Sequence, residues 1–523
     1  MTVPAVGRRP FAWRRAGLAA LAGAAAVLGF APFYVWPVPI AALAVLFLLW
    51  SHCESPRQAA LTGFVFGLGL FLAGVSWVYV SLHVYGQMPA LLAGVATLLF
   101  CAYLALFPAA AGWLAKRLTP YPGTAAVLLA MPAAFVLLEW VRGWLFSGFP
   151  WLVVGYSQVP YGLLAGWAPF VGAYGVSLAT AVAAGLVASF ALAPRRSRPR
   201  VLFGVAFVVW LAGGGAMRQA SFTEPVGPPL SVALLQGNVP QDRKWLPEVR
   251  DETLRDYLNL IVRREARVVV LPETALPTFL DALPTGYLEA VRTHAEGAGK
   301  TVLIGAVERV FSGRESTYYN SVVDVTQPGA AAYRKRHLVP FGEFIPPGFR
   351  WVLSVLNIPL TDFAAGSAQQ PPLEAGGTRW AVAICYEDIF GEELASQLPQ
   401  ANLLLNVSND AWFGRSLAAD QHLQFSQMRA LETGRWMLRA TNTGVTAAID
   451  ETGRVVSSLP QFTMAALAAS PVPRVGATPY VRWGNGATLL LIAVAIVGAC
   501  RGLVGKPTSP KARPPDRGKT IRR

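Results

Sequence analysis

The sequence predicts a polytopic α-helical membrane domain and a water-facing α/β domain inserted before the last membrane span. The chain has 523 residues, of which 54% are hydrophobic and 14% charged, whereas a soluble protein carries about 25% charged residues. Its apolar residues gather into runs of the length that crosses a bilayer, roughly 17–25 residues. Residues from about 228 to 475 instead alternate short strand-like runs with polar helical stretches.

Eight apolar runs have the length of a span, seven before the α/β domain and one after it. They comprise residues 16–32, 34–51, 58–80, 88–115, 123–146, 162–193, 201–219 and 485–503. The first run resembles a signal peptide, but further spans follow at once, which favours an uncleaved anchor. The predicted parts are a membrane domain (1–219), an α/β domain (220–484), a C-terminal transmembrane helix (485–503) and a basic tail (504–523).

The basic residues predict the orientation of these spans. With a cytoplasmic N-terminus, the cytoplasmic segments hold 19 of the 44 Lys and Arg residues, and their only acidic residues are Glu54 and Asp516. The short loops of the opposite side contain no Lys or Arg. Since basic residues accumulate on the cytoplasmic side, both termini are predicted in the cytoplasm and the α/β domain outside it. A nucleic-acid-binding protein would concentrate its basic residues on a folded domain, so nucleic acid is not an expected partner.

Two ionisable residues, Glu139 and Arg142, lie in the fifth apolar run. Charged residues within a bilayer are costly and often functional. Two interpretations stay open: a functional role, or pairing of the two side chains one turn apart near the outer interface. The following loop, from Phe149 to Tyr156, is aromatic and uncharged, which suits a membrane interface or a surface that faces lipid chains.

The α/β region contains eight strand-like runs with helical patterns between them. The runs are at 231–236, 268–271, 302–304, 321–325, 380–384, 403–407, 437–440 and 446–449, and the clearest helical patterns are at 248–263 and 284–298. Strand–helix alternation is typical of layered α/β domains. A region of this size is long enough to bury its own core.

One cysteine, Cys385, lies in this domain, whereas Cys53, Cys101 and Cys500 lie in or at the edge of predicted spans. Structural cysteines in an oxidising compartment form pairs. Cys385 has no such partner in its domain, so it is either a buried apolar residue or a nucleophile.

Three residues each follow a strand-like run: Glu273, Lys335 and Cys385. A free thiol is mostly protonated at neutral pH, so a nucleophilic cysteine needs a base and a cation. We interpret Glu273 as the base and Lys335 as the cation that stabilises the thiolate and a tetrahedral oxyanion. The Tyr386 N–H is a second candidate oxyanion donor, and Glu343 is expected to hold Lys335 or to shuttle a proton. Each residue alone has an ordinary structural explanation, such as a helix cap or a solvated charge. Their common placement at the ends of strands favours a catalytic site.

The Glu–Lys–Cys order, with Cys-Tyr-Glu after an apolar strand, resembles the nitrilase (carbon–nitrogen hydrolase) superfamily. Such a domain between membrane spans resembles the apolipoprotein N-acyltransferase family, and the resemblance covers essentially the whole chain. The motifs that carry it are Gln236-Gly-Asn238, Lys244-Trp245, Pro272-Glu273-Thr274, His337-Leu-Val-Pro-Phe-Gly-Glu343, Cys385-Tyr386-Glu387 and Asn409-Asp-Ala-Trp412-Phe-Gly414.

The resemblance implies a nitrilase-like αββα sandwich and assigns site residues. Its catalytic residues correspond to Glu273, Lys335 and Cys385. Its supporting residues correspond to Trp245, Glu343, Tyr386 and Glu387.

The resemblance also implies a two-step acyl transfer at the bacterial inner membrane, with the catalytic domain on the periplasmic side. Cys385 would take an acyl chain from a phospholipid as a thioester, and the N-terminal α-amine of a diacylglyceryl-modified apolipoprotein would then accept it. Water must be kept from the thioester. Trp245, Tyr386 and Trp412 are candidate shields, although an ordinary core or interface role stays open for Trp412.

Two other classes of protein share part of this pattern. A membrane-anchored nitrilase-type amidase that hydrolyses a C–N bond would use the same three residues, but seven spans exceed what an anchor needs. A transporter or scaffold with a degenerate domain is disfavoured by the intact Glu, Lys and Cys. No cofactor or metal is predicted, because the five histidines lack ligand spacing and the sequence shows no phosphate-cradling glycine loop.

Overall fold

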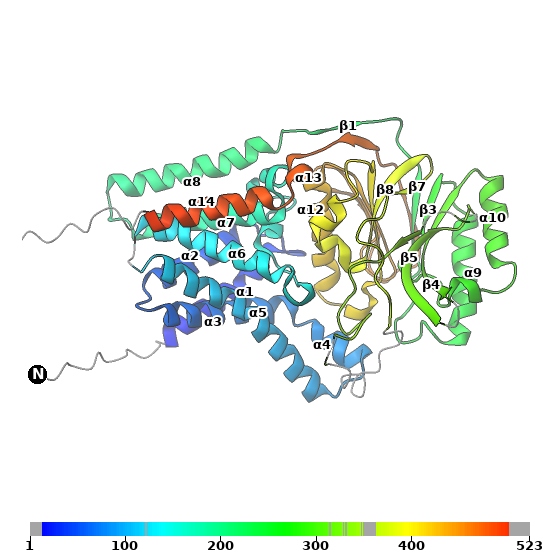
Figure 1. The fold of residues 1–523 in the computed structure, drawn as a ribbon, viewed down its shortest axis with the longest axis horizontal. Helices are drawn as coiled ribbons and strands as arrows, with labels where there is room; N and C mark the ends of the chain where they lie inside the picture. Colours follow the sequence, from blue (N-terminus) through cyan, green and yellow to red (C-terminus); the bar gives the residue numbers. More distant parts are fainter. Residues whose placement is uncertain are drawn as a thin grey trace, which may run out of the picture.

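The computed structural model describes residues 13–120, 123–312, 315–327, 329, 332–346, 348 and 362–501. A helical bundle and an α/β domain lie end to end, and the last helix returns from the α/β domain along the bundle (Figure 1). The predicted basic tail (504–523) and the N-terminal Arg8 and Arg9 lie outside the described residues.

Each of the eight predicted apolar runs contains a helix. These helices are α1 (Trp13–Ala26), α2 (Pro37–Ser51), α3 (Pro56–Val75), α5 (Ala90–Leu118), α6 (Met131–Arg142), α7 (Ala168–Leu192), α8 (Arg198–Met217) and α14 (Gly486–Arg501). Among the described helices, α3, α5, α7 with the turn before it, and α8 are long and apolar enough to cross a membrane, while α2 and α14 are apolar but shorter. The number of eight spans therefore stays a prediction.

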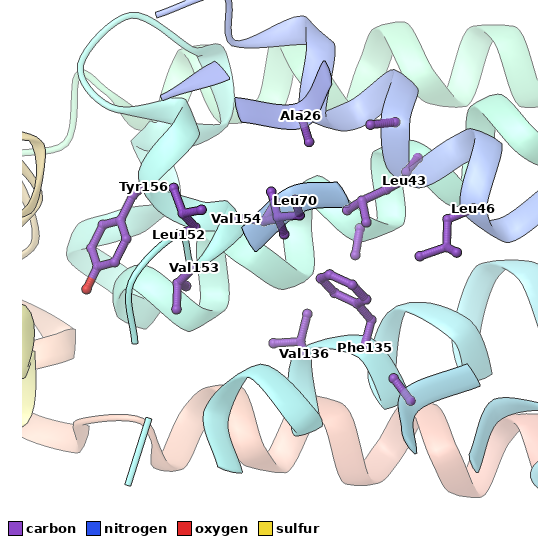
Figure 2. Close-up of a cluster of buried hydrophobic side chains, with 14 of the residues drawn as sticks. Ala26, Leu43, Leu46, Leu70, Phe135, Val136, Leu152, Val153, Val154 and Tyr156 are labelled. Carbon is purple, nitrogen blue, oxygen red and sulfur yellow. The ribbon is translucent and has the colours of Figure 1, made fainter. Parts of the chain in front are cut away.

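The bundle is held by close helix contacts and one shared apolar core. A Cβ on Gly63 of α3 would lie 2.2 Å from the carbonyl oxygen of Pro108 in α5, so the contact between these helices requires glycine. Figure 2 shows side chains from α1, α2, α3, α6 and the segment 152–156 meeting in one cluster. Helix α8 runs along the outside of the bundle (Figure 1) and buries only Gly214. Apolar surface of this extent marks a membrane-facing side.

Glu139 and Arg142 are both buried, and they bind the aromatic loop rather than each other. The Glu139 carboxylate accepts the Val154 N–H at 2.9 Å. The Arg142 guanidinium donates to the carbonyl oxygens of Phe149 and Trp151 at 2.5 and 2.7 Å. These two described side chains form no direct ion pair within 4.0 Å, although their charges act on each other, so the predicted pairing is indirect. Their partners show that they shape the loop that faces the α/β domain.

The α/β domain contains two six-stranded sheets, ordered β13-β2-β3-β4-β5-β6 and β12-β11-β10-β9-β8-β7. The first comprises β2 (Val232–Gln236), β3 (Val268–Val270), β4 (Thr301–Ser312), β5 (Glu315–Asp324), β6 (Ala332–Arg334) and β13 (Ala465–Ala469). The second comprises β7 (Leu373–Ala375), β8 (Thr378–Ile384), β9 (Leu403–Ser408), β10 (Met437–Thr441), β11 (Ala447–Ile449) and β12 (Val455–Ser458). All eight predicted runs are strands, which confirms the layered α/β class. The short strand β6 is the strand-like run expected before Lys335, whereas the edge strands β7, β12 and β13 were not predicted.

Alternating apolar side chains build the layers of this domain. Leu234 of β2 and Val382 of β8 belong to the core between the two sheets, while Leu235 belongs to the core beneath α9 (Pro247–Val262) and α10 (Tyr287–Gly297). Helices α11 (Gly391–Ala395) and α12 (Ala418–Thr433) cover the second sheet. The order of layers is helix, sheet, sheet, helix. Strands β2, β3 and β4 run parallel, as do β8, β9 and β10, so each set ends at one edge of its sheet.

Helix α12 lies between the second sheet and the bundle (Figure 1). Several of its buried polar residues bind groups of the membrane domain. Gln421 Oε1 accepts the indole N–H groups of Trp151 and Trp77 at 2.6 and 3.3 Å, and its amide donates to the Gly74 carbonyl at 3.2 Å. Further bonds join Gln424 to Ala31 and Val159, and Glu432 to Ala173. The α/β domain is thereby docked on the bundle through satisfied polar groups.

Replacing Gln421 by leucine should destabilise this docking. The Gln421→Leu variant leaves the buried Trp151 indole donor without an acceptor, whereas Trp77 keeps its bond to the Gly74 carbonyl at 3.1 Å. An unpaired buried donor costs about 1–3 kcal/mol. We expect a lower midpoint of thermal unfolding for the purified protein in detergent. The matched control is Gln400→Leu, at an exposed position on the α/β domain, and it should unfold with the wild type. Equal midpoints for Gln421→Leu and wild type would contradict the assigned role of the contact.

Candidate active site

The three residues that the sequence singles out lie at the ends of three strands. Glu273 follows β3, Lys335 directly follows β6, and Cys385 directly follows β8. Strands β3 and β6 belong to the first sheet and β8 to the second. The candidate site therefore lies where the ends of the two sheets meet.

The Lys335 ammonium is buried between two carboxylates. Its side chain is 1% exposed, and Nζ lies 2.9 Å from Glu343 and 3.6 Å from Glu273. Asn320 of β5 donates its amide to both carboxylates, at 2.7 Å to Glu273 and 3.0 Å to Glu343. The second oxygen of Glu273 accepts the Asn409 N–H at 2.8 Å. Both carboxylates are therefore held in place with hydrogen bonds, as buried charges require.

Opposing effects set the protonation of the lysine and the thiol. Burial by itself lowers the pKa of Lys335, but the Glu343 and Glu273 carboxylates outweigh burial and raise this pKa well above its usual value. Burial raises the pKa of the Cys385 thiol, Glu273 acts in the same direction, and Lys335 opposes both. The net effect is a raised pKa for Cys385. The site thus combines a lysine that stays cationic with a resting thiol that stays protonated and has to lose its proton to react.

Glu387 joins the turn at Cys385 to the segment that carries Lys335. One oxygen accepts the backbone N–H groups of Arg336 and His337 at 2.7 and 3.1 Å. The other accepts the Ile384 N–H at 2.7 Å and the Tyr333 hydroxyl at 3.1 Å. A single buried carboxylate therefore ties the end of β8 to the chain on both sides of Lys335.

A second buried network, which the sequence did not predict, lies behind Cys385. The imidazole of His422 contacts Asp388 through Nε2 at 2.9 Å and Asp410 through Nδ1 at 2.8 Å. The Arg439 guanidinium contacts the same two carboxylates at 3.3 and 2.8 Å. Burial lowers the pKa of His422, as does Arg439, but Asp388 and Asp410 outweigh them and raise it to about 9. The histidine is therefore protonated at neutral pH.

No local pattern could have identified His422. It lies in the middle of α12, and its partners come from the turn after β8, the turn after β9, and β10. The only signal was the presence of Asp410 within the motif from Asn409 to Gly414.

In the Lys244-Trp245 motif, the structure brings the lysine rather than the tryptophan to Glu273. The buried Lys244 ammonium donates to the Thr274 hydroxyl at 2.7 Å. Burial lowers the pKa of Lys244 to about 8, although Glu273 acts in the opposite direction. Trp245 is partly exposed, and its supporting role stays a prediction.

The two other predicted shielding residues contact the membrane domain. Tyr386 donates its hydroxyl to the Gly148 carbonyl at 2.8 Å, and its ring stacks at 6.4 Å from Phe149 in the aromatic loop. The Trp412 carbonyl accepts the Ser81 hydroxyl at 2.8 Å, and its ring meets that of Tyr85 edge-on at 6.1 Å. Aromatic side chains of the two domains therefore meet beside the turns that follow β8 and β9.

Comparison with known proteins extends over both parts of the chain. A family model described as the apolipoprotein N-acyltransferase N-terminal domain matches residues 22–186, and one described as carbon-nitrogen hydrolase matches residues 231–480. The apolipoprotein N-acyltransferase of Nitrosomonas europaea is 50% identical, covering 91% of this chain and 95% of the relative. The protein of the same name from Methylococcus capsulatus is 46% identical, covering 93% and 94%. That from Ralstonia nicotianae is also 46% identical, covering 92% and 93%.

The raised pKa of His422 predicts that stability depends on pH. A group whose pKa rises on folding stabilises the folded state below its unfolded pKa, here 6.5, and this contribution is lost as the pH rises through about 9. At about 1.4 kcal/mol per pKa unit, up to about 3 kcal/mol of unfolding free energy is at stake. We expect the thermal midpoint of the wild type to fall between pH 6.5 and 9 more steeply than that of His422→Gln.

The difference between the thermal midpoints of wild type and His422→Gln isolates the contribution of His422, because the other groups titrate in both proteins. Parallel curves for wild type and His422→Gln over this pH range would contradict the assignment of a charged imidazole.

Proposed function

This chain belongs to the apolipoprotein N-acyltransferase family, and we propose that it carries the acyl group as a thioester on Cys385. It is accordingly a membrane enzyme that transfers an acyl group to lipoproteins. The observation that carries the thioester proposal is the convergence of Glu273 and Lys335 on the Cys385 thiol, whose protonation both charges influence.

In the first half-reaction, the donor is a membrane phospholipid. Glu273 takes the thiol proton as the Cys385 sulfur attacks the ester carbon. The negative charge that develops on the carbonyl oxygen of the ester is stabilised by the Lys335 ammonium. When the tetrahedral intermediate collapses, the carbon–oxygen bond breaks and Glu273 returns the proton to the leaving alkoxide. The products are a lysophospholipid and an acyl thioester.

In the second half-reaction, the acceptor is the N-terminal α-amine of the diacylglyceryl-modified cysteine of an apolipoprotein. The amine attacks the thioester carbon, and Glu273 takes a proton from the nitrogen. Collapse expels the Cys385 thiolate, which recovers that proton from Glu273. An amide forms and the free thiol is regenerated, so no cofactor is consumed.

The other residues support this chemistry by position. Glu343 holds the Lys335 ammonium at 2.9 Å, and Glu387 fixes the strand end that carries the nucleophile. Tyr386 and Trp412, which contact the membrane domain, keep water from the thioester, and Trp245 contributes to the same shield. Exclusion of water decides between transfer and hydrolysis of the thioester.

The orientation of the enzyme follows from its charges. The basic residues in the short segments favour cytoplasmic termini and place the catalytic domain on the periplasmic side of the bacterial inner membrane, with eight spans in the bundle. Docking of the α/β domain on the bundle through α12 supports a site at the membrane surface, where both lipid substrates are found.

A membrane-anchored amidase is the alternative that uses the same three residues. The match to relatives over 91–93% of the chain, membrane domain included, favours acyl transfer.

Intact-protein mass spectrometry after incubation with phospholipid tests the thioester. Wild type and the matched control Cys500→Ala, a free cysteine in α14, should gain one fatty-acyl mass that hydroxylamine removes. Cys385→Ala should gain none. Folded wild type without an increment across several phospholipids would contradict the proposal and favour the amidase.

Replacement of the proposed base tests the first proton transfer. Glu273→Gln keeps the size of the side chain but removes its basicity, so the rate of acyl-enzyme formation should fall by about 10²–10⁴-fold. The matched control Glu289→Gln, exposed on α10, should acylate at the wild-type rate. A wild-type rate in Glu273→Gln would assign the base to another group.

A further inference from the structure

We infer that His422 and Asn406 are positioning residues that aim the Tyr386 N–H as an oxyanion donor by holding the other side of the same peptide group. The inference rests on the proposed chemistry at Cys385 and adds a device behind the nucleophile. Neither residue touches the reacting atoms, and both act through the backbone of Cys385.

The Cys385 carbonyl oxygen is held by side chains from two different elements. Two buried side chains meet this oxygen, Asn406 Nδ2 from β9 at 3.0 Å and His422 Nε2 from α12 at 3.2 Å. Most backbone carbonyls receive one hydrogen bond from secondary structure. Two side-chain partners from separate elements fix the direction of this carbonyl.

The geometry of the peptide bond links this carbonyl to the Tyr386 N–H. The bond between Cys385 and Tyr386 is trans, and a trans peptide is planar with its C=O and N–H pointing in opposite directions. Because Asn406 and His422 draw the carbonyl into the interior of the domain, the Tyr386 N–H is directed away from that interior. At the start of a short helix this N–H also has no acceptor within the helix, so it is available to an oxyanion.

The backbone of Cys385 is strained. Cys385 has φ = +52°, in the left-handed region. A residue with a side chain pays roughly 1–3 kcal/mol for such a conformation and keeps it only where the surroundings enforce it. The partners of the carbonyl on one side, and the bond from Ile384 to Glu387 on the other, supply that enforcement. Without them the peptide would relax and rotate its N–H.

A charged histidine suits this position because its ring can donate from both nitrogens. Both ring nitrogens of His422 face carboxylates, Asp388 and Asp410. Only the protonated ring donates from both nitrogens. The Nε2–H is then shared between Asp388 and the Cys385 carbonyl, and it cannot become an acceptor that would repel the carbonyl. Arg439, which bridges the two carboxylates, also donates to Asn406 Oδ1 at 2.7 Å and so orients the second donor.

Two reactions of the same thiol separate positioning from general stability. Acylation by p-nitrophenyl butyrate passes through a tetrahedral oxyanion and needs the aimed N–H. Alkylation by iodoacetamide displaces iodide at a saturated carbon and forms no oxyanion. A merely structural role would lower both rates together, whereas a positioning role lowers acylation alone.

The experiment uses the full chain in detergent and compares the ratio of the two rates. His422→Asn keeps a polar group near Nδ1 but loses the Nε2 contact, whereas His422→Gln places an amide donor near Nε2. Asn406→Asp retains the acceptor for Arg439 and removes the donor to Cys385. The matched control is His294→Asn on α10, far from the site in the fold.

We expect the ratio of acylation to alkylation to fall about 10²-fold in His422→Asn and in Asn406→Asp, which is the scale of losing one oxyanion donor. His422→Gln should recover to within about tenfold of wild type, and His294→Asn should be unchanged. An unchanged ratio in both His422→Asn and Asn406→Asp would overturn the inference. If His422→Asn does not fold, the ratio in Asn406→Asp decides.

The soluble ester keeps this test separate from the identity of the natural donor. A wild type that reacts with the ester but never with phospholipid would contradict the proposed function, and the ratios would still decide the inference. A wild type that is alkylated at Cys385 but not acylated by the ester would overturn the inference itself.

Discussion

The burial of the Lys335 ammonium is the constraint on which the rest of the site depends. A cation that is 1% exposed is tolerated only with charged partners close by. Those partners are Glu273 after β3 and Glu343 in the loop after β6, and Asn320 of β5 bridges them. Satisfying one buried charge therefore aligns three strands of the first sheet. Burial raises the pKa of the nearby Cys385 thiol, and the Glu273 carboxylate adds to this effect against Lys335, so the thiol rests in its protonated form.

Helix α12 connects this chemistry to the membrane domain. Neighbouring residues on the helix face different partners: Gln421 binds Trp77 and Trp151 of the bundle, while His422 binds the network behind Cys385. A rigid helix transmits position between the two. Under the proposed function both substrates are lipids, so the distance of the nucleophile from the bilayer has to be fixed. An almost entirely buried helix that binds both domains provides that fixed distance.

A carbon–nitrogen hydrolase domain becomes useful for transfer once its surroundings change. Under the proposed function, the nucleophile, base and cation serve hydrolysis or transfer equally well, because both pass through the same thioester. The difference lies in the aromatic surface contributed by both domains, where Tyr386 meets Phe149 and Trp412 meets Tyr85. Under the proposed function, these contacts favour an amine from the membrane over water from the periplasm.

The sequence by itself determined the local features, because periodicity and motif order need no knowledge of packing. These features are the apolar runs that become helices, the eight principal strands, and the placement of Glu273, Lys335 and Cys385 at strand ends. Only the tertiary structure decided the partners of buried polar groups. Asn320 in mid-strand, His422 in mid-helix, and the loop contacts of Glu139 and Arg142 look ordinary in the sequence. Their roles arise because burial obliges each polar group to find a partner, and folding supplies that partner from a distant segment.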